Sequence, residues 1–226
     1  MTERYSRSAI EGFGDEQQKR LSEARVFVAG CGGLGSAVLQ YLAAAGIGTL
    51  MIADHDRVAL SNLHRQVLYT TDQIGMPKAE CAAARLAAIN PEIEIVAHTI
   101  AVDGDNFTRL AAEADMVVDC TDSYAVRVML SEKCKAHGKP FIYASAEEMG
   151  GQVALFTPSC GVYYHELFPR VPKQKAAVGV MPPMPGIIGS IEAVETIKYI
   201  ARIGDTLEGR LLVADMRKLS FRIFDL

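Results

Sequence analysis

The sequence predicts an α/β fold in which a Rossmann-like, doubly wound and mostly parallel sheet is extended by antiparallel strands in the C-terminal half. Three observations support this prediction. A glycine-rich turn over residues 30–35 follows an apolar run and precedes a helix-like stretch. Short apolar runs alternate with helical patterns over the first two-thirds of the chain, as they do in βαβ units around a parallel sheet. Beyond residue 150 the rhythm changes, and two short strand-like runs follow each other directly.

Each predicted strand of the parallel part is a short, largely apolar run. These strands span Ala24–Ala29, Thr49–Ala53, Ile93–Ala97, Met116–Cys120 and Phe141–Ala144. Helices are predicted between them, at Ser36–Ala45, Lys78–Ile89, Asn106–Glu113 and Ser123–His137. Pro77 suits the first position of the second helix, and Gly138 suits the end of the fourth.

The C-terminal half is predicted to be mixed. Short antiparallel strands are expected at Gln152–Thr157 and Gly161–Tyr164, an amphipathic helix at Ile187–Ile203, and two strands within Leu211–Phe224. Residues 169–186 hold five prolines and show no clear period. They predict a long connection, and such connections are often functional.

The composition favours one domain in the cytoplasm. The chain has 226 residues, of which 50% are hydrophobic, and this is ample for a core. The net charge of −4 gives no basic footprint for nucleic acid. No apolar stretch approaches the roughly 20 residues of a membrane span. The polar N-terminus lacks the apolar core of a signal peptide, so we expect neither a membrane partner nor secretion.

The cysteines are scattered and form no C-x-x-C pair. They are Cys31, Cys81, Cys120, Cys134 and Cys160. An odd, unclustered set argues against a disulfide framework and against a structural zinc site. We expect at least four of the five to be buried, reduced thiols.

The spacing Gly30-x-Gly32-x-x-Gly35 is that of a dinucleotide-binding turn, which places phosphate at a helix N-terminus. Asp54 stands at the end of the second predicted strand, where such folds carry the acid that holds a ribose hydroxyl. Asp56 lies further into the loop and is the alternative for that role. NAD and ATP fit these residues equally well, and a tight strand–helix crossing without ligand is the other interpretation.

The segment that follows favours a triphosphate. Asn62, Arg65 and Gln66 lie together, and Lys78 comes just after Pro77. Two cations and an amide near a phosphate-binding turn suit a group whose extra charge must be neutralised while pyrophosphate leaves. Taken alone, these residues also fit an ordinary solvated loop.

Two carboxylates mark the end of the fourth predicted strand. Asp119 and Asp122 lie there, and ligands of open α/β sheets bind at the carboxyl ends of strands. A carboxylate at this place suits a Mg²⁺ ion that bridges phosphates. Asp122 equally suits the N-cap of the helix that begins at Ser123.

In this order and spacing, seven motifs resemble the MoeB/ThiF/HesA family, the bacterial relatives of ubiquitin-activating enzymes. The motifs are RYSR (4–7), GCGGLGS (30–36), ADHDRVALSNLHRQ (53–66), GMPKAE (75–80), INPEI (89–93), DCTDS (119–123) and GIIGSIEAVETIK (186–198). The resemblance implies an α/β nucleotide-binding domain, usually a homodimer. It also implies an ATP- and Mg²⁺-dependent adenylyltransferase that activates the C-terminal glycine of a ubiquitin-like sulfur carrier. A ThiS-like carrier would serve thiamine biosynthesis, and a MoaD-like carrier molybdopterin biosynthesis.

The resemblance implies a division of the chain and a role for each matched residue. A single adenylation domain over 1–226 would contain an N-terminal helical arm (1–23), a nucleotide-binding half (24–150) and a carrier-binding half (151–226) with a crossover loop (169–186). The residues implied to line the nucleotide are Gly30, Gly32, Gly33, Gly35, Asp54 for the ribose, and Asn62, Arg65 and Lys78 for the phosphates. Asp122 would hold Mg²⁺. Arg7 matches an arginine that reaches across the dimer to the partner subunit's ATP, so the implied catalytic residues are Arg7, Arg65, Lys78 and Asp122.

The chain departs from the family at two cysteine sites. Family members commonly bind zinc through two C-x-x-C pairs, but here Tyr163 and Glu166 stand at the first pair and no second pair follows. We therefore predict no zinc. Lys175 stands at the place of a crossover-loop cysteine that forms a covalent bond with the carrier in many members, and Cys160 is a weak substitute. Adenylation does not need that cysteine.

The surface that grips the carrier tail is expected to include residues 169–186 and the sheet around Gly150–Val153. Met181, Met184 and Ile188 would give adaptable contacts there, or else pack in the core.

Three other functions stay open. The first is adenylation of a peptide or a modified tRNA base, although the acidic balance disfavours tRNA. The second is an NAD-dependent oxidoreductase, but the sequence offers no candidate site for hydride transfer. The third is a silent partner subunit, against which the intact Arg65, Lys78 and Asp122 argue.

Overall fold

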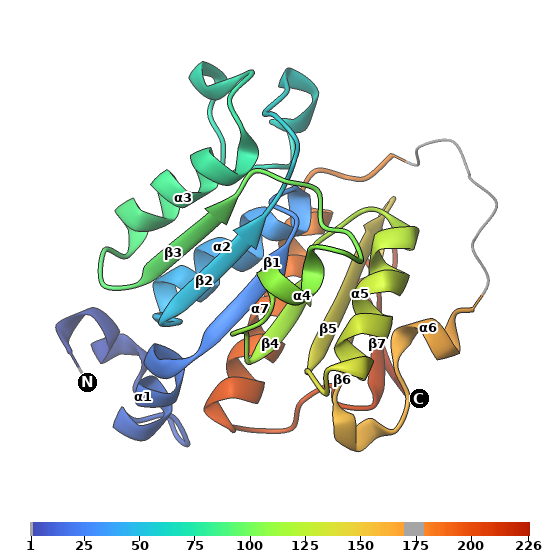
Figure 1. Ribbon diagram of the computed structural model, residues 1–226. Coiled ribbons are helices and arrows are strands. Elements are labelled where there is room, and N and C mark those ends of the chain that lie inside the picture. Colours follow the sequence, from blue (N-terminus) through green and yellow to red (C-terminus); the bar gives the residue numbers. More distant parts are fainter. Residues whose placement is uncertain (1, 170–178) are drawn as a thin grey trace.

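Eight strands form one mixed sheet in the computed structural model, which describes residues 2–169 and 179–226 (Figure 1). Their order across the sheet is β3-β2-β1-β4-β5-β6-β7-β8. The first five pair in parallel, and they span β1 Arg25–Ala29, β2 Thr49–Ala53, β3 Glu94–His98, β4 Met116–Asp119 and β5 Phe141–Glu147. The last three join antiparallel, and they span β6 Gly150–Phe156, β7 Arg210–Asp215 and β8 Ser220–Asp225. The predicted fold class is confirmed.

Helices cover both faces of the parallel part. One face packs against α1 (Asp15–Glu23), α2 (Gly33–Ala45), α3 (Lys78–Ile89) and α7 (Met184–Ala201). The other packs against α4 (Phe107–Leu110), α5 (Tyr124–Ala136) and α6 (Tyr164–Leu167). Side chains alternate between the faces of a strand, so Val26 and Val28 join the first core and Phe27 joins the second. Burial on both faces explains why these strands are continuous apolar runs.

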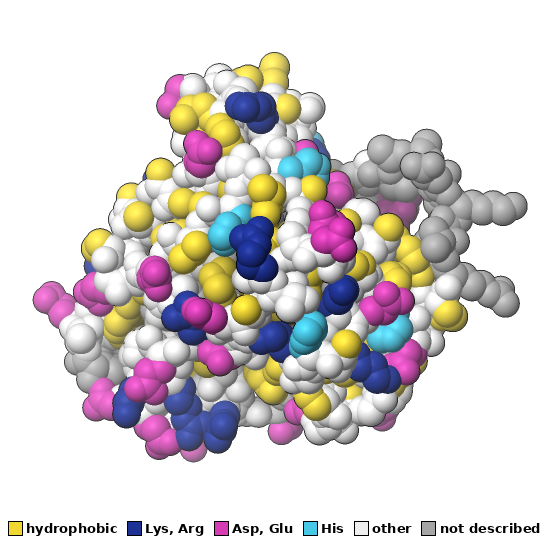
Figure 2. Space-filling model, viewed as in Figure 1, with side chains coloured by type: hydrophobic (Ala, Val, Ile, Leu, Met, Phe, Trp, Pro, Cys, Tyr) yellow, Lys and Arg dark blue, Asp and Glu magenta, His cyan; other side chains and the backbone are white. Residues whose placement is uncertain are grey.

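Short 3₁₀ helices complete the chain at η1 (Glu3–Ser8), η2 (Leu60–Asn62), η3 (Thr71–Gln73) and η4 (Pro158–Cys160). Figure 2 shows acidic and basic side chains crowded together at the lower left, where Figure 1 places the N-terminal arm and α1. Among the described residues, none of the helices combines the length and the apolar character that crossing a bilayer requires.

Most predicted elements are confirmed within a few residues, but four details are wrong. Pro77 is the N-cap of α3, not its first residue. The predicted helix at Asn106–Glu113 shortens to Phe107–Leu110. The predicted connection at 169–186 ends early because α7 already begins at Met184, while residues 170–178, with Lys175, lie outside the described part.

The fourth error is the strand predicted at Gly161–Tyr164. Gly161 takes a left-handed φ of 72°, which turns the chain away from an extended path. The backbone N–H of Tyr163 then donates to Glu166 Oε2 at 2.8 Å, and α6 begins at Tyr164. A local side-chain cap therefore wins over the β propensity of the tyrosines.

The cysteines behave as expected from the sequence. Cys31, Cys81, Cys120 and Cys134 are buried and Cys160 is partly exposed, and all five are free thiols. Burial raises the pKa of the Cys31 and Cys120 thiols well above the ordinary value, so both stay protonated.

Candidate active site

The glycine turn joins β1 to α2 at the carboxyl end of the sheet. Gly30 has a φ of +96°, and a Cβ there would lie 2.7 Å from the carbonyl oxygen of Cys120. A Cβ at Gly35 would collide with the carbonyl oxygen of Gly30 itself. Glycine is therefore required for the turn, the first turn of α2 and the end of β4 to meet. The first N–H groups of α2 lack helical partners, and N–H groups at such a helix start favour an anion such as phosphate.

This close packing predicts a matched pair of outcomes. Gly35→Ala is expected to lower the free energy of unfolding by about 1–3 kcal/mol, because the new methyl group must displace backbone. Gly186→Ala is the control, since this helical glycine has nothing within 4 Å of its Cβ position. Urea unfolding checks both variants, and a Gly35→Ala protein as stable as the wild type would contradict this packing.

Asp54 closes the turn from the end of β2. Its side chain is buried, and Oδ2 accepts the backbone N–H of Cys31 at 2.7 Å. Oδ1 accepts the N–H of Asp56 at 2.8 Å. Each oxygen keeps lone-pair capacity for a further donor, such as a ribose hydroxyl. Asp56, the alternative acid, is occupied elsewhere.

Lys78 is the partner of Asp56. Its ammonium lies 2.8 Å from Asp56 Oδ2, and the lysine side chain is only 5% exposed. The hydrogen bond from Lys78 lowers the pKa of Asp56 below its ordinary value. The N–H of Asp56 donates to Asp54, and Asp54 accepts the N–H of Cys31, so a chain of hydrogen bonds links Lys78 to the glycine turn. A buried cation linked to this turn suits an anionic ligand.

Arg65 and Gln66 lie over the turn. The Cδ of Arg65 is 3.9 Å from the Cβ position of Gly33, and the amide nitrogen of Gln66 is 3.6 Å from that of Gly32. Asn62 supports both, because its carbonyl accepts the N–H groups of Arg65 and Gln66 at 3.0 and 2.9 Å. Most of the predicted nucleotide site is thus gathered in one place.

Gln66 belongs to the polar cluster that the sequence indicated, although it was not among the residues assigned a contact with the nucleotide. It is only 4% exposed, and its Oε1 is buried without a hydrogen-bond partner among the described residues. A buried, unsatisfied amide is costly unless a ligand or water completes it. The polar cluster Asn62–Gln66 was visible in the sequence, but the burial of one member was not.

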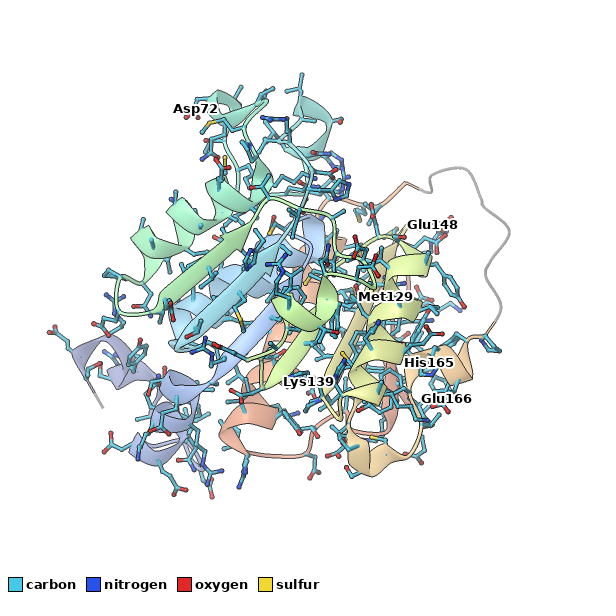
Figure 3. All side chains as sticks on the ribbon, in the orientation of Figure 1. Asp72, Met129, Lys139, Glu148, His165 and Glu166 are labelled. Atoms are coloured by element: carbon cyan, nitrogen blue, oxygen red, sulfur yellow. The ribbon has the colours of Figure 1, made fainter. Side chains whose placement is uncertain are left out.

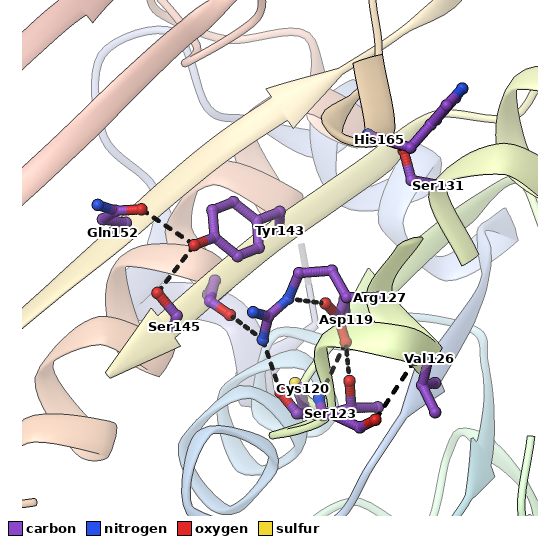
Figure 4. Close-up of polar contacts among 12 residues, drawn as sticks. Asp119, Cys120, Ser123, Val126, Arg127, Ser131, Tyr143, Ser145, Gln152 and His165 are labelled. Atoms are coloured by element: carbon purple, nitrogen blue, oxygen red, sulfur yellow. Dashed lines mark hydrogen bonds and ion pairs between the residues drawn. The ribbon is translucent and has the colours of Figure 1, made fainter. Parts of the chain in front are cut away.

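Asp119 and Asp122 have different surroundings. Asp119 is fully buried and its Oδ2 accepts from Arg127 Nε at 2.7 Å, while Oδ1 accepts the Thr121 hydroxyl at 2.6 Å (Figure 4). Burial lowers the pKa of the Arg127 guanidinium, but the charge of Asp119 and its hydrogen bond keep that pKa above the ordinary value. The guanidinium also lies over the ring of Tyr143, 4.7 Å from its centroid. Both carboxylate oxygens of Asp119 therefore have partners within the chain, and Asp119 stabilises the fold.

Asp122 is exposed and has no hydrogen bond or ion pair to any residue in the described ranges. The alternative role as N-cap of α5 is wrong, because Ser123 is the cap and its Oγ accepts the N–H of Val126 at 3.4 Å. The preceding Cys120 carbonyl abuts Gly30, so this free carboxylate stands at the border of the glycine turn.

A cleft of about 1060 Å³ opens from Asp122 across the exposed surface of the sheet. It is lined by α5, α6, the β5–β6 hairpin and the end of β7, with Asp122, Tyr124, Tyr143, Gln152, Tyr164 and Phe168 among its walls. The hydroxyl of Tyr143 hydrogen-bonds Ser145 Oγ at 2.9 Å and Gln152 Oε1 at 3.0 Å on its floor (Figure 4).

Glu148 marks the rim of this cleft at the β5–β6 turn (Figure 3). It pairs with Arg217 at 2.6 Å, and its backbone bonds Gly179 and Met181. Met181 is 47% exposed, but Met184 and Ile188 are fully buried in the core. The core alternative is therefore correct for these two residues, because α7 begins earlier than the sequence indicated.

Arg7 is not brought to this site. It lies on η1, and the arm packs at the amino ends of β2 and β3, through Gly46 and Asn90. The glycine turn lies at the opposite, carboxyl ends of the strands (Figure 1). The five residues of β2 alone separate these ends by about 16 Å.

The positions that match zinc cysteines do not offer a zinc site. Tyr163 is buried, and its hydroxyl donates to the carbonyl of Lys139 at 2.9 Å. Glu166 binds Lys135 through both oxygens at 2.6 Å, and this bond lowers the pKa of Glu166. Figure 3 places Glu166 and His165 beside α5. A phenol and an occupied carboxylate do not fit a tetrahedral metal with thiolate ligands.

The sequence pattern that defines the ThiF family matches residues 5–226. The chain belongs to the ThiF family. A sulfur carrier protein adenylyltransferase of Thermus thermophilus is 39% identical over 231 residues, which cover 97% of this chain and 85% of the relative. The molybdopterin-synthase adenylyltransferase of Escherichia coli is 40% identical, covering 97% and 90%. A SAMP-activating enzyme E1 of Haloferax volcanii is 39% identical, covering 97% and 83%.

Solved structures share this fold. E. coli MccB superposes with a TM-score of 0.90 at 22% identity, covering 99% of this chain and 71% of that one. PaaA superposes with a TM-score of 0.80 at 23% identity, covering 93% and 66%. At these identities the likeness concerns the ThiF fold alone.

Proposed function

We propose that this ThiF-family chain is an ATP-dependent adenylyltransferase that activates the C-terminal glycine carboxylate of a ubiquitin-like sulfur carrier. The observation that carries the proposal is that Asp122, which lines a cleft, comes two residues after Cys120, whose carbonyl abuts Gly30 of the glycine turn. The glycine turn with Lys78 and Arg65 suits a triphosphate, and Asp122 connects it to a cleft of about 1060 Å³. The names of the relatives in Thermus thermophilus, E. coli and Haloferax volcanii support the same reaction.

The reaction needs positioning and charge neutralisation more than proton transfer. The carrier's terminal carboxylate is already an anion, and it would attack the α-phosphate of ATP while pyrophosphate leaves. No general base is required, and the chain's contribution is to hold both reactants in line. Lys78 and Arg65 would neutralise the leaving phosphates, with the unsatisfied Gln66 amide as an additional contact.

Asp122 fits Mg²⁺, because it is an exposed, uncommitted carboxylate at the border of the turn. The bound metal would neutralise charge on the phosphates. Asp119 is excluded as the ligand by its pair with Arg127.

The cleft suits an extended peptide tail. Its floor is a strand surface that includes Gly150 and Gly151, and its lining combines aromatic side chains with charged ones such as Glu148 and Arg217. A tail ending in two glycines lacks side chains at the last positions and would pass beside Asp122 to the α-phosphate. The soluble carrier would present this tail, and we expect neither nucleic acid nor membrane as a partner.

The direct test is ATP–pyrophosphate exchange in the presence of Mg²⁺ with purified ThiS-like and MoaD-like carriers. Exchange should depend on one carrier and vanish when its last glycine is deleted. The preferred carrier would also assign the thiamine or the molybdopterin pathway. Exchange without any carrier, or binding of NAD in place of ATP, would contradict the proposal.

The position of Arg7 predicts that two chains share each site. In a homodimer, an Arg7→Ala subunit and an Asp122→Asn subunit are each expected to be inactive alone. Their mixture should recover about one quarter of wild-type exchange, because half of the dimers are mixed and each mixed dimer has one intact site. No recovery would show that Arg7 does not act across the dimer. Arg20→Ala, which removes a partly exposed arginine of α1 paired with Glu16, is the control.

A further inference from the structure

The N-terminal arm is fastened to the domain by a buried tyrosine. Tyr5 is only 8% exposed, and its hydroxyl accepts a hydrogen bond from Asn90 Nδ2 at 2.9 Å. Asn90 is fully buried and also donates to the carbonyl of Ala43 at 2.8 Å. The Tyr5 ring lies against Gly46, where a Cβ would be only 2.5 Å from the hydroxyl oxygen. The left-handed φ of +84° at Gly46 and its missing side chain together make room for the ring.

Arg4 makes a second attachment beside the first. Its Nη1 donates to the carbonyl of Ile89 at 3.1 Å, and its Nε lies 3.3 Å from Glu92 Oε1. The η1 turn is closed internally, since Ser6 Oγ donates to the carbonyl of Glu3 at 2.8 Å. Two consecutive residues of this short helix are thus tied to the segment 89–92.

Arg7 follows in the same helix but, unlike Arg4 and Tyr5, takes no part in fastening the arm. It is exposed and forms no hydrogen bond or ion pair with the described ranges 2–169 and 179–226. The sequence alone is equally compatible with a frayed tail here. Instead, the short helix η1 is attached to the domain and exposes the Arg7 guanidinium. This guanidinium lies at the end of the sheet opposite the glycine turn of the same chain.

We propose that the hydrogen bond between Tyr5 and Asn90 is a positioning device that sets where Arg7 enters the active site of a second copy of this chain. Tyr5 and Asn90 lie at the amino ends of β2 and β3, away from the glycine turn at the carboxyl ends. They fix the arm on the subunit that donates Arg7, so a change in either residue should alter the exchange rate at the active site of the partner subunit. This inference rests on the proposed function and on the sharing of Arg7 across a homodimer.

The test uses mixed dimers isolated with two different affinity tags. The reference dimer pairs an Arg7→Ala subunit, which supplies the working site, with an Asp122→Asn subunit, which supplies Arg7. Tyr5→Phe, which removes only the hydroxyl, is then placed on one subunit or the other. On the Arg7 donor it should lower the kcat of exchange by about tenfold to a hundredfold with the KM for ATP little changed. On the subunit that already lacks Arg7 it should leave the rate unchanged.

Placement separates positioning from simple destabilisation. A loss of folding stability would affect the rate in both placements, so equal loss in the two dimers overturns the inference. An unchanged rate with Tyr5→Phe on the Arg7 donor overturns it as well. Tyr41→Phe, which removes an exposed tyrosine hydroxyl, is the control and should have no effect in either place. Failure of the reference dimer itself would instead contradict the shared Arg7 of the proposed function.

Discussion

Asp122→Asn is expected to reduce ATP–pyrophosphate exchange by about 10²–10³-fold, because it removes the carboxylate proposed to hold the Mg²⁺ ion that balances the phosphate charge. The fold should not respond. Asp122 is exposed and has no bonded partner among the described residues, so the free energy of unfolding should stay within about 0.5 kcal/mol of wild type. Exchange assays and urea unfolding on the same preparations give both numbers.

Asp119→Asn is the counterpart in the same turn, and its main expected effect is on folding stability. It leaves the buried Arg127 without its charge partner, and breaking such a pair costs about 3–5 kcal/mol. Asp205→Asn, an exposed change in the loop after α7, controls for the loss of one charge. An Asp122→Asn enzyme with normal exchange, or an Asp119→Asn protein of normal stability, would contradict these assignments.

Lys78→Ala is the second change with a large expected effect. The lysine is held almost without exposure, so under the proposed function its charge would act on a bound phosphate with little screening by water. Exchange should fall by about 10²–10³-fold. Lys19→Ala, which breaks an exposed pair with Glu23 on α1, is the matched control and should leave exchange unchanged.

The same variant, Lys78→Ala, should also change the pKa of Asp56, which NMR can measure. Lys78 lowers the pKa of this carboxyl, so Lys78→Ala should raise it toward its ordinary value in an NMR titration. The sign follows from linkage: a depressed folded pKa adds stability above the ordinary pKa, and this stability is lost as the pH falls through the folded value. The contribution is small because the Asp56 side chain is half exposed. An unmoved Asp56 pKa would contradict the ion pair.

The sequence predicted the parallel half well because its signals are local and agree with one another. The apolar runs, the glycine turn and the acid at the end of β2 each follow from spacing along the chain. They lie together because the carboxyl ends of parallel strands share one edge. The polar cluster Asn62–Gln66 was recognised for the same reason, although no sequence pattern shows that Gln66 is buried.

The remaining features depend on contacts that spacing does not encode. Spacing alone does not distinguish Asp119 from Asp122, although the family resemblance assigned Mg²⁺ to Asp122. The ion pair of Asp119 with Arg127 of α5 is what separates the structural carboxylate from the free one. The sequence left open whether Met184 and Ile188 contact a partner or pack in the core, and α7 starts early and buries them against α2 and the sheet. The fastening of Tyr5 to Asn90 joins residues 85 positions apart.

The most direct test of the central claim follows the α-phosphate. The enzyme, its preferred carrier and Mg²⁺ are incubated with ATP labelled at the α-phosphate, and the products are separated under mildly acidic conditions. We expect the label on the carrier, its release by hydroxylamine as AMP with formation of a C-terminal hydroxamate, and no labelling of a carrier that lacks its last glycine. Label that stays on the enzyme, or AMP released at the same rate without a carrier, would contradict activation of a carrier carboxylate.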